Sequence, residues 1–115
     1  MKLIIKRDQE AKTGLLGGHK GMRFILSYRV ELTPEEQALV TKYKMENYLL
    51  TCTTDKNGDK ISFHTIGSLM RGGTEIVDDV TILLNNEDVL KKACRNFKTL
   101  LEVMATFGGE EVYEF

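Results

Sequence analysis

The residue types that could bind a ligand gather in a glycine-rich, basic stretch near the N-terminus. Residues 13–21, TGLLGGHKG, hold four glycines, one histidine and one lysine. Glycines let backbone amides approach a bound anion, and a lysine supplies positive charge. A Walker loop needs Gly-Lys-Ser/Thr at the start of a helix, whereas Lys20 precedes Gly21 and a predicted strand. The stretch therefore predicts a simple anion-binding loop, with a long hairpin connection that binds nothing as the alternative.

Charge is distributed unevenly along the 115 residues. Residues 1–30 carry seven basic and two acidic side chains, whereas residues 31–115 carry nine basic and fifteen acidic ones. Such asymmetry favours an anion-binding face, unless the two regions interleave in space and their charges mix. The ligand-binding residues that we predict are Lys6, Lys12, Gly17, Gly18, His19, Lys20, Arg23, Arg29 and His64.

Metal and cofactor sites have no support in the spacing of possible ligands. The soft ligands are Cys52, Cys94, His19 and His64, and they form no Cys-x-x-Cys or His-x-x-x-His pair. We therefore interpret both cysteines as small core residues. No metal and no cofactor is predicted.

Residues 55–59, DKNGD, resemble the beginning of a calcium-binding loop, but the residues that follow do not fit one. Alternating Asp and Asn oxygens open such a loop. However, Lys60 stands where the loop requires glycine, and Ile66 stands where it requires a glutamate. The Asn57-Gly58 pair is instead typical of a tight hairpin turn.

Catalysis has little support in the residue pattern. Ser62, Thr51 and His64 are expected to share a sheet face, but many surfaces offer two hydroxyls and an imidazole. Adjacent carboxylates in a strand point to opposite faces, which argues against paired acid–base chemistry. The sequence leans against an enzyme, and the alternative is a small enzyme that uses His64 or His19 as its base.

Two strands and a helix are predicted in the first part of the chain. Residues 2–7 and 22–32 alternate apolar and polar side chains as half-buried strands do, and the glycine-rich residues 8–21 predict a loop between them. Thr33, Pro34 and Glu36 form a capping-box pattern, so a helix is expected over residues 34–45.

A hairpin is predicted in the middle of the chain, with strands at residues 48–54 and 60–66. A two-residue turn places Cys52 opposite Phe63 and Thr51 opposite His64. The face expected to be buried holds Leu50, Cys52, Ile61 and Phe63. The face expected to be open holds Thr51, Thr53, Ser62 and His64.

One strand, a long helix and a last short strand are predicted in the remainder. The β-branched residues within 77–84 favour a strand. Asn85-Asn86 is a capping pair, and apolar residues then recur at three- and four-residue steps as far as Met104. Gly108-Gly109 is expected to end the helix, and residues 111–115 to form the short strand.

These elements predict a single α+β domain covering residues 1–115. We expect a two-layer sandwich, with a mostly antiparallel sheet of five or six strands and two helices on one face. The opposite face is then expected to carry Lys2, Lys6, Arg23 and Arg29 but no aromatic side chain. Nucleic acid is therefore disfavoured as a partner, and an anionic small molecule or an acidic protein fits better.

Composition bounds the class of protein. Apolar residues make up 42% and charged residues 29% of the chain, and no apolar run is long enough to suggest a membrane span. Two cysteines favour a reducing cytoplasm. We expect a small cytoplasmic binding or accessory domain. The alternative is a homo-oligomeric interaction or regulatory module without a small ligand. The open face is expected to carry apolar residues that could pack against a second copy, namely Ile4, Ile25, Leu49 and Ile66.

Overall fold

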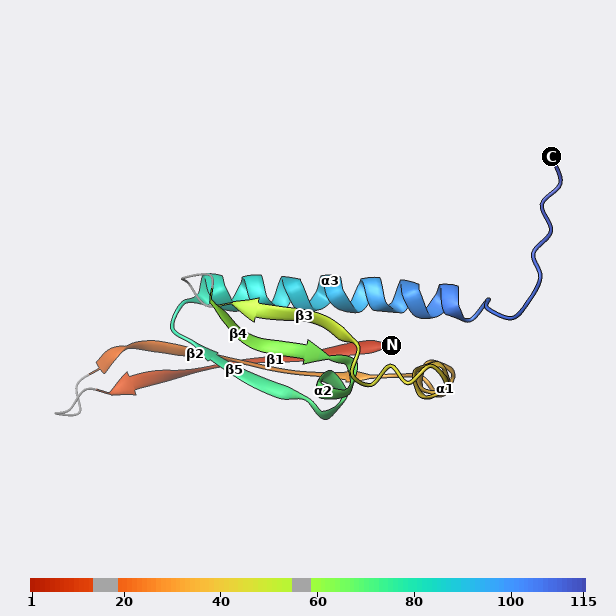
Figure 1. The fold of residues 1–115 in the computed structure, drawn as a ribbon. Coiled ribbons are helices and arrows are strands. Elements are labelled where there is room, and N and C mark those ends of the chain that lie inside the picture. The colour runs from red at the N-terminus through yellow and green to blue at the C-terminus, as the bar shows by residue number, and fades with distance from the viewer. Residues whose placement is uncertain (14–18, 55–58) are drawn as a thin grey trace.

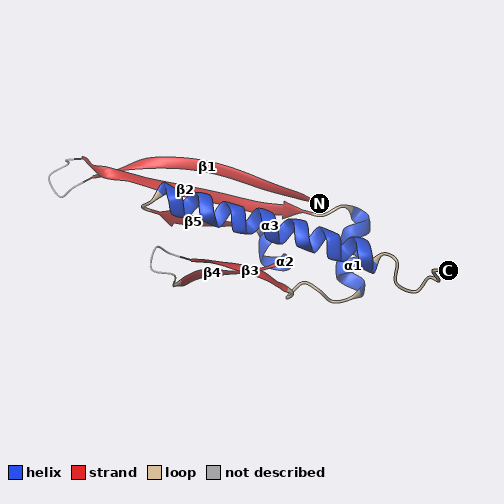
Figure 2. Ribbon diagram, turned by 90° about the horizontal axis from the view of Figure 1, so that it is seen from above, coloured by secondary structure: helices blue, strands red, loops and turns tan. Residues whose placement is uncertain are grey.

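The computed structural model describes residues 1–13, 19–54 and 59–115, with the backbone alone described for Thr13, His19, Lys20, Thr54, Lys60 and Ile61. The fold of these residues is mixed α+β, with three helices and antiparallel sheets (Figure 1, Figure 2). One sheet has three strands and the other has two, so the prediction of a single five- or six-stranded sheet is wrong. No helix in the described ranges has both the length and the apolar character needed to cross a membrane.

The larger sheet contains the two N-terminal strands. Its order is β1 (Lys2–Thr13), β2 (His19–Glu31) and β5 (Gly73–Val77), and both neighbouring pairs are antiparallel. Leu26, Tyr28 and Val30 are buried on one face of β2. The alternation that predicted this strand from the sequence is therefore confirmed.

The loop expected over residues 8–21 is strand at its described positions, residues 8–13 and 19–21. Pairing of β1 with β2 continues from Lys2 opposite Glu31 as far as Ala11 opposite Met22. Figure 1 shows the far ends of both strands projecting beyond the start of the long helix. A ribbon with solvent on both faces needs no apolar alternation, because neither face is buried. Its polar composition is therefore compatible with a strand, and the prediction of a loop is wrong at these positions.

The smaller sheet is the predicted hairpin, formed by β3 (Leu49–Thr54) and β4 (Lys60–Thr65). Cys52 lies opposite Phe63 and Thr51 opposite His64, so the predicted register is confirmed. The turn itself, with Asn57-Gly58 and the rejected calcium pattern, lies outside the described residues.

The buried and open faces of this hairpin are largely the reverse of the prediction. Thr53 and His64 are buried, with exposed fractions of 1% and 2%, whereas Phe63 is 61% exposed. Leu50 still packs against the core, because the pairing is irregular between Leu49 and Thr51. Buried polar side chains persist where they are hydrogen-bonded. The Thr53 hydroxyl donates such a hydrogen bond to Glu75 of β5.

Two short helices connect the strands. α1 (Pro34–Lys42) begins with the predicted capping box, in which Glu36 N donates to Thr33 Oγ1 and Thr33 N donates to Glu36 Oε1. It ends earlier than expected, and Lys44 follows with a left-handed φ of 53°. α2 (Ile66–Arg71) follows β4 directly and begins at the last residue of the strand predicted over residues 60–66.

The long helix α3 (Val80–Met104) begins five residues before the predicted Asn85-Asn86 cap. Its N-cap is Asp79, whose carboxylate accepts a hydrogen bond of 2.8 Å from the amide of Thr81. The strand expected over residues 77–84 is therefore wrong beyond Val77. Residues 111–115 form no strand and are exposed.

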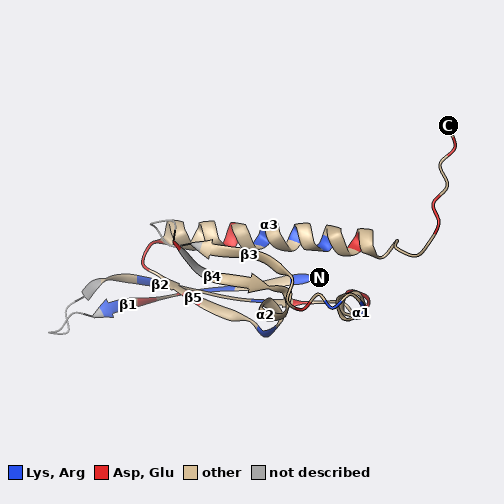
Figure 3. Ribbon diagram, viewed as in Figure 1, with Lys and Arg blue, Asp and Glu red and all other residues tan. Residues whose placement is uncertain are grey.

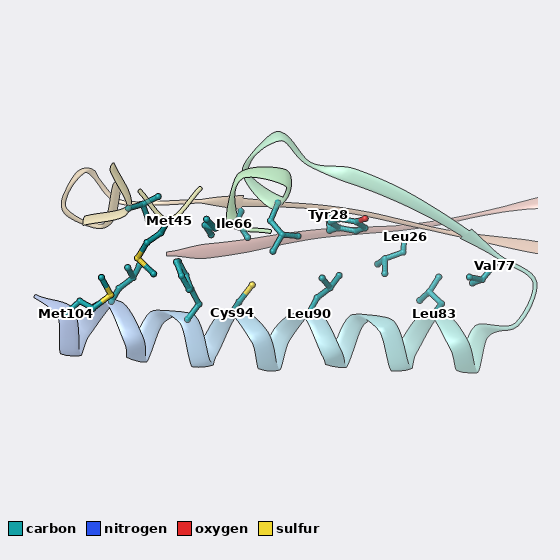
Figure 4. Packing of buried hydrophobic residues seen from close by; sticks show 14 residues of the cluster. Leu26, Tyr28, Met45, Ile66, Val77, Leu83, Leu90, Cys94 and Met104 are labelled. Atoms are coloured by element: carbon teal, nitrogen blue, oxygen red, sulfur yellow. The ribbon is translucent and has the colours of Figure 1, made fainter. Parts of the chain in front are cut away.

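The apolar stripe of α3 packs against the sheets. Leu83, Leu90, Cys94 and Met104 point toward the strands in Figure 4 and are buried. Cys94 is thus a core residue, as predicted, and burial raises the pKa of its thiol to about 11. The face of the larger sheet that carries Leu26 and Tyr28 is consequently the core face, and Lys6 and Arg29 lie on the other.

Candidate anion-binding site

A depression of about 480 Å³ lies on the face of the larger sheet opposite the core. It receives side chains from β1, β2, β5 and the end of α2. Its lining comprises Ile4, Lys6, Ser27, Tyr28, Arg29, Arg71, Gly72, Gly73 and Thr74. We call it the basic pocket.

Strand alternation and register place the polar lining of the basic pocket. Lys6 of β1 lies opposite Ser27 of β2, and Ile4 lies opposite Arg29, so all four side chains share one face. On the next strand Thr74 lies opposite Ser27, and their hydroxyl oxygens are 3.3 Å apart. The pocket thus combines basic groups with two adjacent hydroxyls.

Three cationic side chains line the basic pocket, and they differ in their partners. Arg29 Nη1 lies 2.8 Å from Glu31 Oε1, so its charge is partly compensated. Among the described residues, no carboxylate lies within 4.0 Å of the charged nitrogens of Lys6 or Arg71. Both side chains are exposed. Two uncompensated cations at one depression are suited to hold an anion.

The two glycines after α2 bring Arg71 to the sheet. Gly72 has a φ of 84°, which favours glycine over other residues. A Cβ atom on Gly73 would lie 2.7 Å from the hydroxyl oxygen of Tyr28. Only glycine lets the chain pass this close to Tyr28, and this approach places Arg71 beside β2.

The predicted ligand-binding residues are dispersed in the structure. Lys6 and Arg29 line the basic pocket. Arg23 Nη1 lies 3.3 Å from Glu10 Oε1, and Lys12 Nζ lies 2.6 Å from Asp78 Oδ1, so each is paired with an acid. Gly17 and Gly18 lie outside the described residues, as do the side chains of His19 and Lys20.

Sequence reasoning did not include Arg71 or Thr74 in the site. The Arg-Gly-Gly-Thr run of residues 71–74 is visible in the sequence, and glycine pairs often mark a close approach of backbones. What the sequence did not reveal is the pairing of β5 with β2. That pairing, between segments nearly fifty residues apart, brings these side chains to Lys6.

His64 is buried in the core instead of lying on the open face. Its Nε2 lies 3.2 Å from Glu75 Oε1, within ion-pair distance. The same oxygen accepts hydrogen bonds from Thr53 at 2.8 Å and Tyr28 at 3.3 Å. Asn86 Nδ2 of α3 donates to Glu75 Oε2 at 3.2 Å. We call these five residues the Glu75 cluster.

The electrostatics of the Glu75 cluster favour a charged carboxylate. Burial alone raises the pKa of Glu75, but contacts with His64, Thr53 and Tyr28 outweigh burial and hold the pKa below its ordinary value. Burial and the nearby Glu75 raise the pKa of Tyr28 to about 12. A catalytic base must reach its substrate, whereas His64 is only 2% exposed. The arrangement suits a structural role that joins the two sheets.

Neither a metal site nor a related protein indicates the function. The described residues contain no group of three or more His, Cys, Asp or Glu side chains that could hold a metal ion. Comparisons of the chain with protein-family models, curated proteins and solved structures found no match. The chemistry of the site is therefore the evidence for function.

Proposed function

We propose that this protein binds a small oxyanion, such as a phosphate ester or a polycarboxylate, in the basic pocket. The observation that carries the proposal is the convergence of Lys6 and Arg71 on one depression without an acidic partner among the described residues. Figure 3 shows basic positions on β1, on β2 and at the end of α2.

The lining suits an oxyanion of this kind. An arginine guanidinium donates two parallel hydrogen bonds to a phosphate or carboxylate group, and a lysine adds a point charge. The hydroxyls of Ser27 and Thr74 are further donors, and Ile4 offers an apolar contact. The volume of about 480 Å³ falls within the ordinary range for small-molecule sites.

The proposal requires an open sheet face, as in the expected two-layer sandwich with helices on the other face. It also retains the expected cytoplasmic location, which rests on the small number of cysteines. Because the pocket is open to water, binding is expected to weaken as salt is added.

Isothermal titration calorimetry with pyrophosphate at low ionic strength tests the proposal. A double variant, Lys6→Gln with Arg71→Gln, removes both uncompensated charges. We expect it to bind at least tenfold more weakly, since a charge-assisted hydrogen bond contributes about 1.5–3 kcal/mol. Citrate as a second titrant distinguishes phosphate from carboxylate chemistry.

The matched control is Lys42→Gln with Lys92→Gln, which removes the same charge at exposed positions on α1 and α3. It should retain wild-type affinity within twofold. Equal losses in both variants would indicate a general charge effect and contradict a site. Unchanged affinity in the pocket variant would also contradict the proposal.

A further inference from the structure

A second depression lies between the beginning of β1 and the C-terminal half of α3. Its volume is about 250 Å³, and its lining comprises Met1, Leu3, Lys91, Cys94, Arg95 and Lys98. Three of these residues are apolar or sulfur-containing, and three are basic. We call it the α3 groove. Its residues are distinct from those of the basic pocket.

The strand that borders the α3 groove has a free edge. β1 pairs with β2 on one side, and no strand of the described residues pairs with its other side. An edge strand presents unpaired backbone N–H and C=O groups that recruit another strand. The groove therefore combines an apolar floor, a basic wall and an edge for backbone hydrogen bonds.

The C-terminal residues have complementary chemistry. Residues 108–115, GGEEVYEF, combine three acidic side chains with one aliphatic and two aromatic ones after a glycine pair. They form no regular element, extend away from the body of the molecule, and leave Val112 and Tyr113 80% and 72% exposed (Figure 1). Figure 3 shows acidic positions in this tail and basic positions in the C-terminal half of α3.

We propose that the tail of one copy of the chain binds in the α3 groove of a second copy, as a strand added beside β1. In an extended tail Glu111, Tyr113 and Phe115 share one side. The two aromatic rings cover the apolar floor of the groove, and Glu111 lies beside its basic wall. Reciprocal exchange of the two tails gives a twofold dimer.

The direction of the tail favours a second copy over the same chain. It leaves the end of α3 and runs outward, whereas its own groove lies back along the helix at Lys91–Lys98 (Figure 1). Binding to its own groove would require the chain to reverse within residues 105–109. Binding to a second copy requires no such reversal, because the tail extends away from its own chain.

A charge exchange tests this dimer in the full-length chain. The tail variant carries Glu111→Lys, and the groove variant carries Arg95→Glu with Lys98→Glu. Lys91 is left unchanged because its Nζ lies 3.0 Å from Glu87 Oε1. In sedimentation velocity at low salt, the wild-type chain should dimerise and each variant should be monomeric. An equimolar mixture should form a heterodimer, because each tail then meets a groove of opposite charge.

The control is Lys92→Glu with Glu102→Lys, two exposed positions of α3 outside the groove. It should dimerise like the wild type, and circular dichroism should show that every variant is folded. A monomeric wild-type chain at all accessible concentrations would overturn the proposal. So would variants that still dimerise, or a mixture that stays monomeric.

Discussion

Gly73 is the first residue of β5 and lies opposite Tyr28 of β2. Its added Cβ would lie 2.7 Å from the hydroxyl oxygen and 2.9 Å from Cζ of Tyr28. Tyr28 has little room to move, because its ring is buried and meets His64 edge-on with ring centroids 5.1 Å apart. Tyr28 belongs to the Glu75 cluster, and both Tyr28 and Gly73 line the basic pocket. The absence of a side chain at Gly73 is therefore needed for both features.

Gly73→Ala is therefore expected to destabilise the protein. Inserting a methyl group into a packed site costs about 1–3 kcal/mol in unfolding free energy. Urea unfolding followed by circular dichroism measures this difference. Gly109→Ala is the matched control, since the nearest atom to its added Cβ is 3.6 Å away. Equal stability of the two variants would show that the Tyr28 side chain moves to make room for the methyl group, and it would contradict the prediction.

The first turn of α3 is helical because of its packing, although its local sequence favours a strand. Val80, Thr81 and Ile82 are β-branched, which lowers helix propensity only slightly. Leu83 continues the buried stripe that runs through Leu90, so helical packing extends toward the N-terminus. Burial of this stripe outweighs the local preference for a strand.

Asp79→Ala tests where α3 begins. Loss of an N-cap carboxylate costs about 1 kcal/mol, so the urea midpoint should fall. Asp88→Ala, at an exposed position within α3, is the control and should have a smaller effect. If the helix began at residue 85 instead, Asp79→Ala would leave stability unchanged.

Two buried carboxylates connect elements across the whole molecule. Glu87 of α3 accepts hydrogen bonds from Arg7 of β1 at 2.7 Å and 2.6 Å. The hydrogen bonds from Arg7 hold the pKa of Glu87 below its ordinary value, against the effect of burial. Glu75 joins β5 to the hairpin and to α3, and its pKa is also lowered.

Stability should therefore fall in acid. A carboxylate whose pKa is lowered on folding stabilises the folded state. This stabilisation is fully present above the unfolded pKa of about 4.5, and it is lost as the pH falls through the folded pKa. Urea unfolding between pH 7 and pH 3 should show this loss. Glu75→Gln with Glu87→Gln should be less stable at pH 7 and should show a shallower decline toward pH 3.

The control for acid stability is Glu35→Gln, an exposed position in the first turn of α1. It should keep the wild-type decline. A double variant with an unchanged decline would show that these two carboxylates do not govern acid stability.

Local patterns determined much of the secondary structure from the sequence alone. The core face of β2, the capping box at Thr33 and the register of Cys52 against Phe63 were all predicted and confirmed. Each depends on side-chain alternation or on hydrogen bonds between residues close together in the chain. Such interactions are fixed by residue spacing before the elements pack.

Only the tertiary structure decided which polar residues are buried and which cations meet. His64 is buried because Glu75, Thr53 and Tyr28 surround it, and the residues of a hairpin do not reveal partners on other elements. Lys6 and Arg71 share a pocket because β5 pairs with β2. Long-range pairing is set by the packing of the whole chain, so a local sequence pattern does not encode it.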